Sequence, residues 1–397
     1  MDPIFTKPME IINTLQIQGY QAFFVGGAVR DSLLGRKIGD VDIATSATPI
    51  EVIAHFPKTI PVGIQHGTII VMLDGVGYEV TTFRKDEEYL DHRRPTSVTF
   101  IDSLSEDLKR RDFTMNAIAM DCDGHLFDPF GGQEAIKMKI IQTVGTPADR
   151  FKEDALRMLR AIRFHSQFSF TIEQKTKEAI RLQAHLLKHV SIERITTEFE
   201  KILSGPSCHS ALKVVGECGL GASIENLATY EETLQEWENI DYTALQSNSE
   251  RWSLFSYLLK VKDVESFLMS WKLPRKTIRD AVKIVAGLKT VIESGWTPLI
   301  LYKTGRNIST SIERIYSVIH KLNVEVRVKE RVNEYENLPI NDKVAIDFET
   351  LDLFEVWERK PGPWINEALD SIVMALLNGQ VQNDRESIRE WLVSCSQ

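Results

Sequence analysis

The sequence of 397 residues is poor in cysteine and lacks any apolar run long enough to cross a membrane. Its four cysteines, Cys122, Cys208, Cys218 and Cys395, lie far apart and form no C-x-x-C pair. This spacing argues against a zinc site or a disulfide scaffold and is typical of the reducing cytoplasm. A membrane helix needs roughly 18 or more consecutive apolar residues. The first residues, MDPIFTKPMEII, also have no long apolar core, so we expect neither a membrane span nor a signal peptide.

The chain has no overall excess of positive charge: its net charge is −9, which on average disfavours a polyanionic partner. The charges are nevertheless segregated along the sequence. Residues 221–250 contain seven acids and no Lys or Arg, whereas residues 270–332 contain thirteen Lys and Arg against five acids. Because local patches decide phosphate binding, residues 270–332 are a candidate nucleic-acid surface. A solvated helical face is an equally weighted alternative.

Internal repeats and low-complexity tracts are also absent, so the organisation is read from local patterns. Residues 21–25 and 40–45 predict strands, and residues 66–73 and 77–83 predict a hairpin turned by Asp74-Gly75. After Pro147 the strand signals fade and apolar residues recur at helical spacing, with one helix expected over residues 150–168. We therefore expect an α+β protein: a small N-terminal mixed α/β part with a β-sheet, followed by an elongated all-helical part.

Two aspartates two positions apart, Asp40 and Asp42, are the first candidates for chemistry. Alternate residues of a strand share a face, so the two carboxylates would lie side by side and repel each other unless a cation sits between them. Mg²⁺ prefers such oxygen ligands and usually also contacts substrate phosphates. Two such ions can activate a 3′-hydroxyl and neutralise a leaving pyrophosphate. Glu79, on the following hairpin, is a candidate third carboxylate. A D-x-D pair alone is weak evidence, because exposed acid pairs are common.

A glycine turn before the aspartates strengthens this interpretation. Gly26 and Gly27 end the first strand and begin a helix, where backbone N–H groups can approach a phosphate closely. Arg30 would add a charge-assisted contact to a triphosphate. An ordinary tight turn is the alternative for the glycines taken alone.

The motifs GGAVRD and DVD together resemble the nucleotidyltransferase superfamily that includes DNA polymerase β. More narrowly, the chain is similar to the class II CCA-adding tRNA nucleotidyltransferases of Gram-positive bacteria. Three further segments carry this resemblance, residues 110–117, 128–132 and 153–160, together with residues 361–384 near the C-terminus. The resemblance implies a catalytic head (1–147), a neck that recognises the base (148–205), a body (206–295) and a tail that binds tRNA (296–397).

The same resemblance implies Mg²⁺ as cofactor, CTP and ATP as substrates, the 3′ end and acceptor stem of tRNA as partner, and no nucleic-acid template. It also makes Arg111 a candidate for triphosphate binding. Whether the chain forms a homodimer is left open.

Base selection can be argued from the segment EDALRMLRAIRF. Asp154 and Arg157 stand at i and i+3, which makes them neighbours on one ridge of a helix. Cytosine and adenine each place an amine donor beside a ring-nitrogen acceptor, so Asp154 can accept from the amine and Arg157 can donate to the ring nitrogen. Uracil and guanine present the reverse order and would leave a buried charge unpaired. Arg160 and Arg163 continue the ridge towards phosphate or sugar. An i,i+3 salt bridge between Asp154 and Arg157 is the plain alternative.

Other relatives leave alternatives open. The polar segment 84–95 resembles a flexible loop of complete CCA-adding members, although A-adding members keep such a loop too. Bacterial poly(A) polymerases share the head motifs, but they usually carry long basic C-terminal extensions that are not seen after Trp391. No His-Asp dipeptide occurs, which excludes the phosphohydrolase domain of some relatives. A non-catalytic RNA-binding protein is the least favoured alternative.

Overall fold

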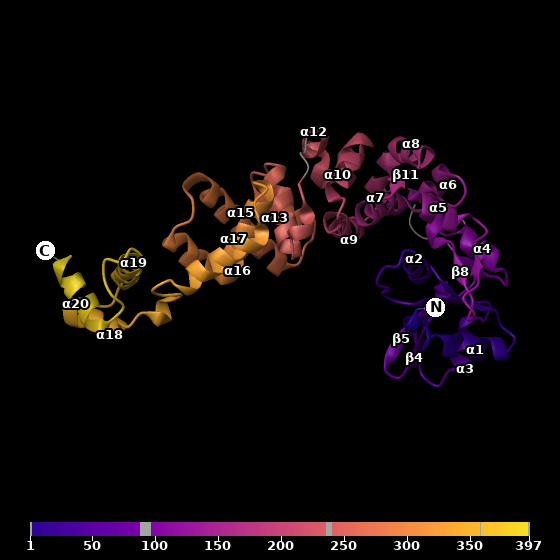
Figure 1. The fold of residues 1–397 in the computed structure, drawn as a ribbon, viewed down its shortest axis with the longest axis horizontal. Coiled ribbons are helices and arrows are strands. Elements are labelled where there is room, and N and C mark those ends of the chain that lie inside the picture. Colours follow the sequence, from indigo (N-terminus) through magenta and orange to yellow (C-terminus); the bar gives the residue numbers. More distant parts are fainter. Residues whose placement is uncertain (1, 88–96, 236–239, 358, 396–397) are drawn as a thin grey trace. The chain divides into compact units, whose positions relative to one another are not determined.

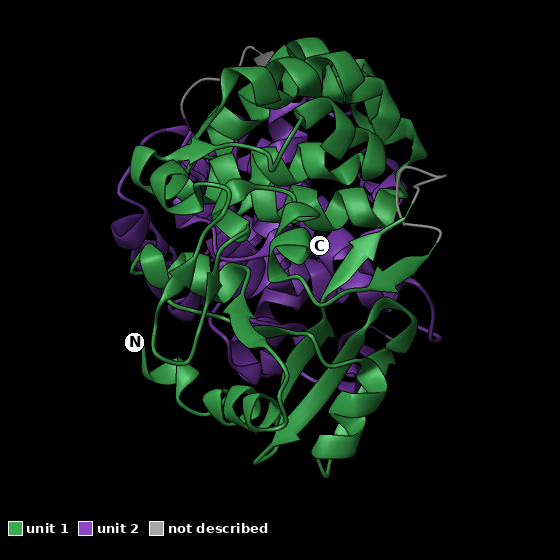
Figure 2. Ribbon diagram, turned by 90° about the vertical axis from the view of Figure 1, so that its right-hand side faces the viewer, with its two compact units in different colours: residues 1–238 green, residues 239–397 purple. Residues whose placement is uncertain are grey.

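The computed structural model describes residues 2–87, 97–235, 240–357 and 359–395 and divides the chain into two compact units. Figure 2 colours these units, residues 1–238 and residues 239–397. The first unit begins with a sheet and continues in helices, and the second unit contains helices and no strand among its described residues (Figure 1). The predicted α+β class is therefore confirmed, while the finer division into four domains stays a prediction. Among the described helices, none combines the length and the apolar character needed to span a bilayer.

The main sheet of the first unit has seven strands in the order β3-β4-β5-β2-β1-β8-β9. The strands are β1 Ala22–Val25, β2 Asp42–Thr45, β3 Thr59–Gly63, β4 Thr68–Leu73, β5 Val76–Thr82, β8 Ala119–Met120 and β9 Leu126–Phe127. Strands β2 and β5 pair in parallel and the other neighbours pair antiparallel, so the sheet is mixed. The register of the parallel pair, Ile43 with Val80, places the start of β2 beside the middle of β5.

The hairpin between β4 and β5 confirms the prediction from Asp74-Gly75. Asp74 has φ 49° and Gly75 has φ 85°, the two positive values that a tight two-residue hairpin turn requires. A short two-stranded sheet, β6 Arg84–Asp86 with β7 Val98–Phe100, follows the hairpin. The predicted loop 84–95 begins in β6, and most of it lies outside the described residues.

The helices of the first unit are mostly short. They are α1 Met9–Ile17, α2 Gly27–Leu33, α3 Pro49–His55, α4 Leu104–Lys109, α5 Gly132–Met138, α6 Pro147–Glu153, α7 Leu156–Phe168, α8 Gln174–Gln183, α9 Ile192–Leu203, α10 Cys208–Glu217, α11 Leu220–Ser223 and α12 Glu231–Gln235. Two predictions were wrong. The expected helix over residues 150–168 is two helices, α6 and α7. The part after Pro147 was also expected to be all-helical, but residues 171–172 form a short strand, β11 Thr171–Ile172. This strand pairs with β10 Ile140–Ile141.

The second unit is a set of packed helices with acidic groups in its interior. The helices are α13 Asn248–Leu258, α14 Val264–Ser270, α15 Arg275–Ser294, α16 Pro298–Ile319, α17 Val324–Glu336, α18 Thr350–Val356, α19 Trp364–Leu377 and α20 Arg385–Ser394. Helix α16 packs against α13, α15 and α17 (Figure 1). Its Glu313 is fully buried and accepts hydrogen bonds from Trp296 Nε1 (2.6 Å), Arg327 Nε (2.9 Å) and Arg331 Nε (3.1 Å).

Glu250 on α13 is the second buried acid of this unit, with 2% exposure. Its Oε1 accepts hydrogen bonds from Arg314 Nη1 at 2.7 Å and from Ser311 Oγ at 2.8 Å. Arg314 and Arg331 belong to the basic segment 270–332, yet both are buried in ion pairs. Part of the segment's positive charge therefore holds the fold together and cannot face a partner.

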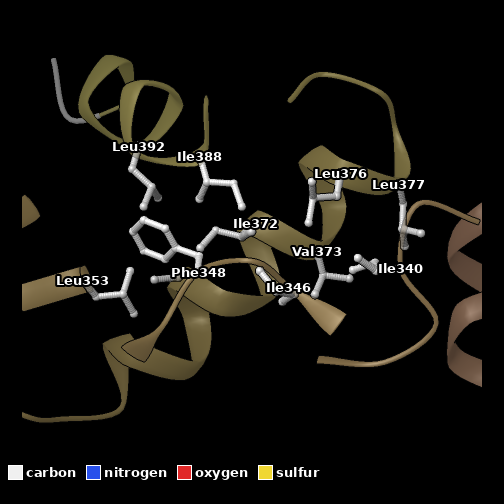
Figure 3. Packing of buried hydrophobic residues seen from close by; sticks show 11 residues of the cluster. Ile340, Ile346, Phe348, Leu353, Ile372, Val373, Leu376, Leu377, Ile388 and Leu392 are labelled. Atoms are coloured by element: carbon white, nitrogen blue, oxygen red, sulfur yellow. The ribbon is translucent and has the colours of Figure 1, made fainter. Parts of the chain in front are cut away.

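A separate apolar cluster forms the C-terminal part of the second unit (Figure 3). Eleven buried residues between Ile340 and Leu392 make up this cluster, and Ile372 of α19 lies among them with 0% exposure. Leu299 and Tyr302, from the beginning of α16, pack against it. Helix α16 is kinked directly after them at Gly305, whose φ of 70° suits glycine. The part of α16 before the kink therefore contributes side chains to this C-terminal cluster.

We expect Ile372→Ala to lower the free energy of unfolding of the second unit by about 3 kcal/mol, because the cluster cannot close the cavity that is left. Met374→Ala on the same helix is the matched control, since Met374 is 38% exposed. Thermal unfolding, with hydrogen exchange to locate the change, measures the effect. Equal losses for the two variants would contradict the assignment of this core.

Candidate active site

The candidate carboxylates gather where β2 begins, beside the middle of β5. The register pairs Ile43 with Val80, and both of these side chains are fully buried. Asp42 and Glu79 each precede this pair by one residue, so they share the opposite face of the sheet. Burial raises the pKa of Asp42 to about 6, and the negative charges of Glu79 and Asp40 add to this rise against the opposing charge of Arg111.

The position of Asp40 differs in one respect from the prediction. Strand β2 begins at Asp42, so Asp40 precedes the strand and is exposed. The alternation still holds, because Val41 between the two aspartates is 5% exposed and anchors the segment in the core. Asp40 and Asp42 line one pocket of about 670 Å³.

The carboxylates of Asp40 and Asp42 form no hydrogen bond and no ion pair with any residue that the structure describes. Two unpaired carboxylates beside a third acid offer hard, negatively charged oxygens, the donors that a divalent cation such as Mg²⁺ binds. The residues present therefore fit a divalent metal ion.

A second group of metal-binding residue types lies elsewhere in the first unit. Asp121, Asp123 and His125 bring ligand atoms within 4.8 Å of one another in the turn between β8 and β9. Asp121 Oδ1 already accepts hydrogen bonds from the backbone N–H groups of Asp123 (2.9 Å) and His125 (2.8 Å). This cluster holds its own turn and does not line the pocket, so we do not assign it to the site.

The glycine turn brings the backbone close to the carboxylates. Gly26 has φ 72°, and a Cβ placed there would lie 3.2 Å from Arg111 Nη1 and 3.7 Å from Asp42 Oδ2. The backbone conformation favours glycine at this position, and a Cβ would also contact the Arg111 guanidinium tightly. Helix α2 begins at Gly27, so the N–H groups of its first turn have no acceptor within the helix.

Every arginine that lines the pocket has a carboxylate partner. Arg30 makes hydrogen bonds from Nε and Nη2 to Asp31, each 3.0 Å long, and donates from Nη1 to Asn116 at 2.6 Å. Arg110 and Arg111 share the buried Asp107. The other pairs are Arg157 with Glu153, Arg160 with Asp112, Arg163 with Glu198 and Arg194 with Asp154.

The candidate triphosphate ligands Arg30 and Arg111 are thus in the pocket, but part of their hydrogen-bonding capacity is used within the protein. Each guanidinium carries five N–H donors, so donors remain for an anionic ligand. The Nε atom of Arg111 is buried and has no partner among the described residues.

The motif alone does not reveal the individual roles of Asp112 and Asn116. In the structure, these two residues link the residues around Arg30 to α7. Asn116 donates to Asp112 Oδ1 at 3.0 Å and accepts from Arg30, while Asp112 Oδ2 accepts from Arg160 Nε at 2.7 Å. Burial alone would raise the pKa of Asp112, but Arg160 and the bond from Asn116 hold it well below its ordinary value. Arg160 therefore acts first as the partner of a buried acid.

The two base-reading candidates line the same pocket but do not share one helix. Asp154 lies in the break between α6 and α7, with an extended backbone of φ −138° and ψ 105°. Its Oδ1 accepts from the backbone N–H of Leu156 at 3.1 Å, a local bond that competes with helix continuation. The predicted common ridge is therefore wrong, whereas the convergence of Asp154 and Arg157 on one pocket is present.

Helix α9 supplies pocket residues that the motifs did not indicate. Arg194 and Lys201 line the pocket, and Glu198 lies between them. These three residues stand at i, i+4 and i+7, a polar stripe on an otherwise amphipathic helix. That stripe was readable in the sequence, but its partner Asp154 lies 40 residues away.

Comparisons with known proteins identify the family. A model described as "Poly A polymerase head domain" matches residues 22–142, one described as "Probable RNA and SrmB- binding site of polymerase A" matches residues 169–227, and "tRNA nucleotidyltransferase domain 2 putative" matches residues 243–392. The CCA-adding enzyme of Bacillus cereus (strain B4264) is 46% identical over 392 residues, covering 99% of each chain. The chain belongs to the CCA-adding enzymes.

Solved structures agree with this family. The crystal structure of the Bacillus stearothermophilus CCA-adding enzyme in complex with CTP is 44% identical, covers 100% of this chain and 98% of that one, and superposes with a TM-score of 0.92. The Thermotoga maritima CCA-adding enzyme complexed with tRNA is 21% identical, with a TM-score of 0.68 over 100% of this chain and 97% of that one, and shows the shared fold alone. The resemblance predicted from GGAVRD and DVD is confirmed.

We expect Asp112→Asn to destabilise this CCA-adding enzyme by about 3 kcal/mol at pH 7, because Arg160 loses the charge that it pairs with. The pKa of Asp112 is lower in the folded protein than in the unfolded chain, so its ionised form stabilises the fold. This contribution is lost as the pH falls from the unfolded-state pKa through the lower pKa of the folded protein. The difference from wild type should stay constant from pH 8 to pH 5 and shrink only below about pH 4. Thermal unfolding across this series measures it; a difference that shrinks between pH 8 and pH 5 contradicts the assignment.

Proposed function

We propose that this enzyme adds and repairs the 3′-terminal CCA of tRNA from CTP and ATP without a nucleic-acid template. One observation carries the proposal: in a pocket where every lining arginine is paired, Asp40 and Asp42 alone are left as unpaired carboxylates among the described lining residues. Family membership and the CTP bound by the Bacillus stearothermophilus relative support it.

Asp40 and Asp42, with Glu79 beside them, would hold Mg²⁺. When bound, Mg²⁺ makes the 3′-hydroxyl of the RNA a better nucleophile and neutralises charge on the leaving pyrophosphate. The hydroxyl oxygen attacks the α-phosphate in line, forming the new P–O bond while the bond to pyrophosphate breaks, and the hydroxyl proton is lost. The Gly26-Gly27 turn, Arg30 and Arg111 hold the triphosphate in place for this step.

Asp154 and Arg157 select the base in this proposal. Each oxygen of the Asp154 carboxylate makes one hydrogen bond within the protein, so lone pairs remain to accept from the exocyclic amine of cytosine or adenine. Arg157 donates to the neighbouring ring nitrogen. Arg160 and Arg163, held by Asp112 and Glu198, shape the adjoining wall of the pocket.

The incorporation assay tests this function directly: tRNA lacking its last three nucleotides is incubated with Mg²⁺ and labelled CTP or ATP. We expect ordered growth by three nucleotides, C, C and then A. Asp42→Ala should reduce incorporation about a thousandfold or more, because it removes a ligand of the ion whose charge stabilisation is worth several kcal/mol. Asp123→Ala is the matched control, an exposed acid of the second cluster that should leave the rate unchanged.

Other outcomes of the same assay identify the alternatives. Addition of A only to tRNA that already ends in CC indicates an A-adding enzyme, and long A runs on generic RNA indicate a poly(A) polymerase. Binding of tRNA without consumption of CTP indicates a non-catalytic RNA-binding protein. Full activity of a folded Asp42→Ala variant would falsify the proposed role of the carboxylates.

We further propose that part of the basic segment 270–332 binds the tRNA backbone. The exposed Arg275, Arg279 and Lys283 follow one another at i and i+4 along α15, and together with Lys276 they line a groove of about 830 Å³. Glu265 and apolar side chains, among them Met269, form the rest of its wall. These cations face solvent, unlike the buried Arg314 and Arg331.

Replacing Arg275, Arg279 and Lys283 together by alanine should weaken tRNA binding and reduce the slope of log Kd against log salt by roughly two, because fewer counterions are released from phosphates. Titrations at several salt concentrations measure the slope. Lys329→Ala, an exposed cation of α17 outside the groove, is the control and should leave the slope unchanged. An unaltered slope in the triple variant would refute this surface.

A further inference from the structure

Asp154, the candidate acceptor for the base amine, is held by a cation from another helix. Arg194 in the first turn of α9 donates from Nη2 to Asp154 Oδ2 at 2.8 Å. The side chains of both residues line the pocket and are 26% and 17% exposed. With Leu156 N–H on Oδ1 and Arg194 on Oδ2, the plane of the Asp154 carboxylate is fixed from two sides.

Arg194 itself stands on a helix that is fixed to α7. A buried ion pair joins Arg163 Nη1 to Glu198, with distances of 3.1 and 2.9 Å to its two carboxylate oxygens. Ser166 Oγ also donates to the carbonyl of Ile202 at 2.6 Å. These contacts hold α9 against α7, so the guanidinium of Arg194 is presented from a rigid support.

The other base-reading residue is held separately. Arg157 donates from Nη1 to Glu153 at 2.6 Å and from Nη2 to the carbonyl of Arg110 at 3.1 Å. Asp154 and Arg157 therefore point to different partners instead of pairing with each other, although only three positions separate them. Without Arg194, the Asp154 carboxylate would keep only its local bond from the Leu156 N–H and could turn towards another guanidinium of the pocket. Arg160 is such a group, because its pKa is raised first by Asp112 and also by the charge of Asp154.

We infer that Arg194 is a positioning residue for base selection: it fixes the carboxylate of Asp154 towards the incoming base and keeps it from turning towards the other guanidinium groups of the pocket. This inference rests on the proposed function of Asp154 and adds a residue that acts through it.

The test measures kcat and KM for CTP, UTP, ATP and GTP with tRNA lacking its terminal nucleotides. Arg194→Ala should lower the preference for CTP over UTP, and for ATP over GTP, by about 10- to 100-fold, the worth of one charge-assisted hydrogen bond. KM for CTP should rise while kcat with CTP changes little, because the reacting groups remain in place. Arg194→Lys should restore part of the preference, since it keeps the charge but not the fixed geometry.

A double-mutant cycle separates positioning from direct contact. If Arg194 acts through Asp154, the preference of Asp154→Ala and of Asp154→Ala with Arg194→Ala will be the same. A further loss in the double variant would show that Arg194 reads the substrate itself and would overturn the inference. The control is Lys177→Ala, which removes a half-exposed ion pair to Glu217 in the same unit and should leave all four preferences unchanged.

Failure of this inference differs from failure of the proposed function. If Asp154→Ala loses base preference and a folded Arg194→Ala keeps it, only the positioning role is wrong. If Asp154→Ala keeps its preference for C and A, the base-reading role of Asp154 is wrong and the role of Arg194 is wrong with it. Thermal unfolding of each variant confirms that the folded enzyme is being compared.

Discussion

Repulsion between like charges where β2 begins, beside the middle of β5, is the constraint around which the pocket of the first unit is arranged. Parallel pairing of these strands places Asp42 and Glu79 on one face, and Asp40 adds a third negative charge. Such an arrangement costs stability: burial raises the pKa of Asp42, and the negative charges of Glu79 and Asp40 add to this rise. The fold could have relieved it by turning an arginine onto Asp42, but Arg111, the nearest candidate, is bound by Asp107 instead. The carboxylates are thereby left for a cation from solution.

Repulsion between like charges also constrains the arginines of the pocket. Seven arginines line it, and seven unpaired guanidinium groups would repel one another strongly in a partly buried space. Carboxylate partners remove most of this repulsion and fix the direction of each side chain. Because a guanidinium has more donors than its partner uses, the pocket can still bind a triphosphate without breaking these pairs. Preorganised donors of this kind need little rearrangement when charge develops during the reaction.

The features that could be predicted from the sequence are local ones. The hairpin at Asp74-Gly75, the glycine turn at Gly26 and the shared pocket of Asp40 and Asp42 depend on neighbouring residues and on the period of a strand. The break between α6 and α7 was missed because the apolar spacing continues across it, while the side chain of Asp154 bonds to the backbone two residues ahead. The pair of Asp154 with Arg194 joins residues 40 positions apart, and no local pattern encodes such a contact.

The basic segment shows why charge counted along a chain is a poor guide to a binding surface. Arg314 and Arg331 contribute to its excess of cations, but each is buried against an acid, Glu250 or Glu313, which leaves its charge compensated inside the fold. Among the exposed cations of α15, Arg279 pairs with the partly exposed Asp280 of the same helix, and no buried acid of the described residues binds Arg275 or Lys283. A buried charge is stable only when its partner of opposite charge is present. An exposed row of cations instead attracts a polyanion through positive charge that no acid compensates. The second unit therefore separates the cations that stabilise it from those that remain available to a polyanion.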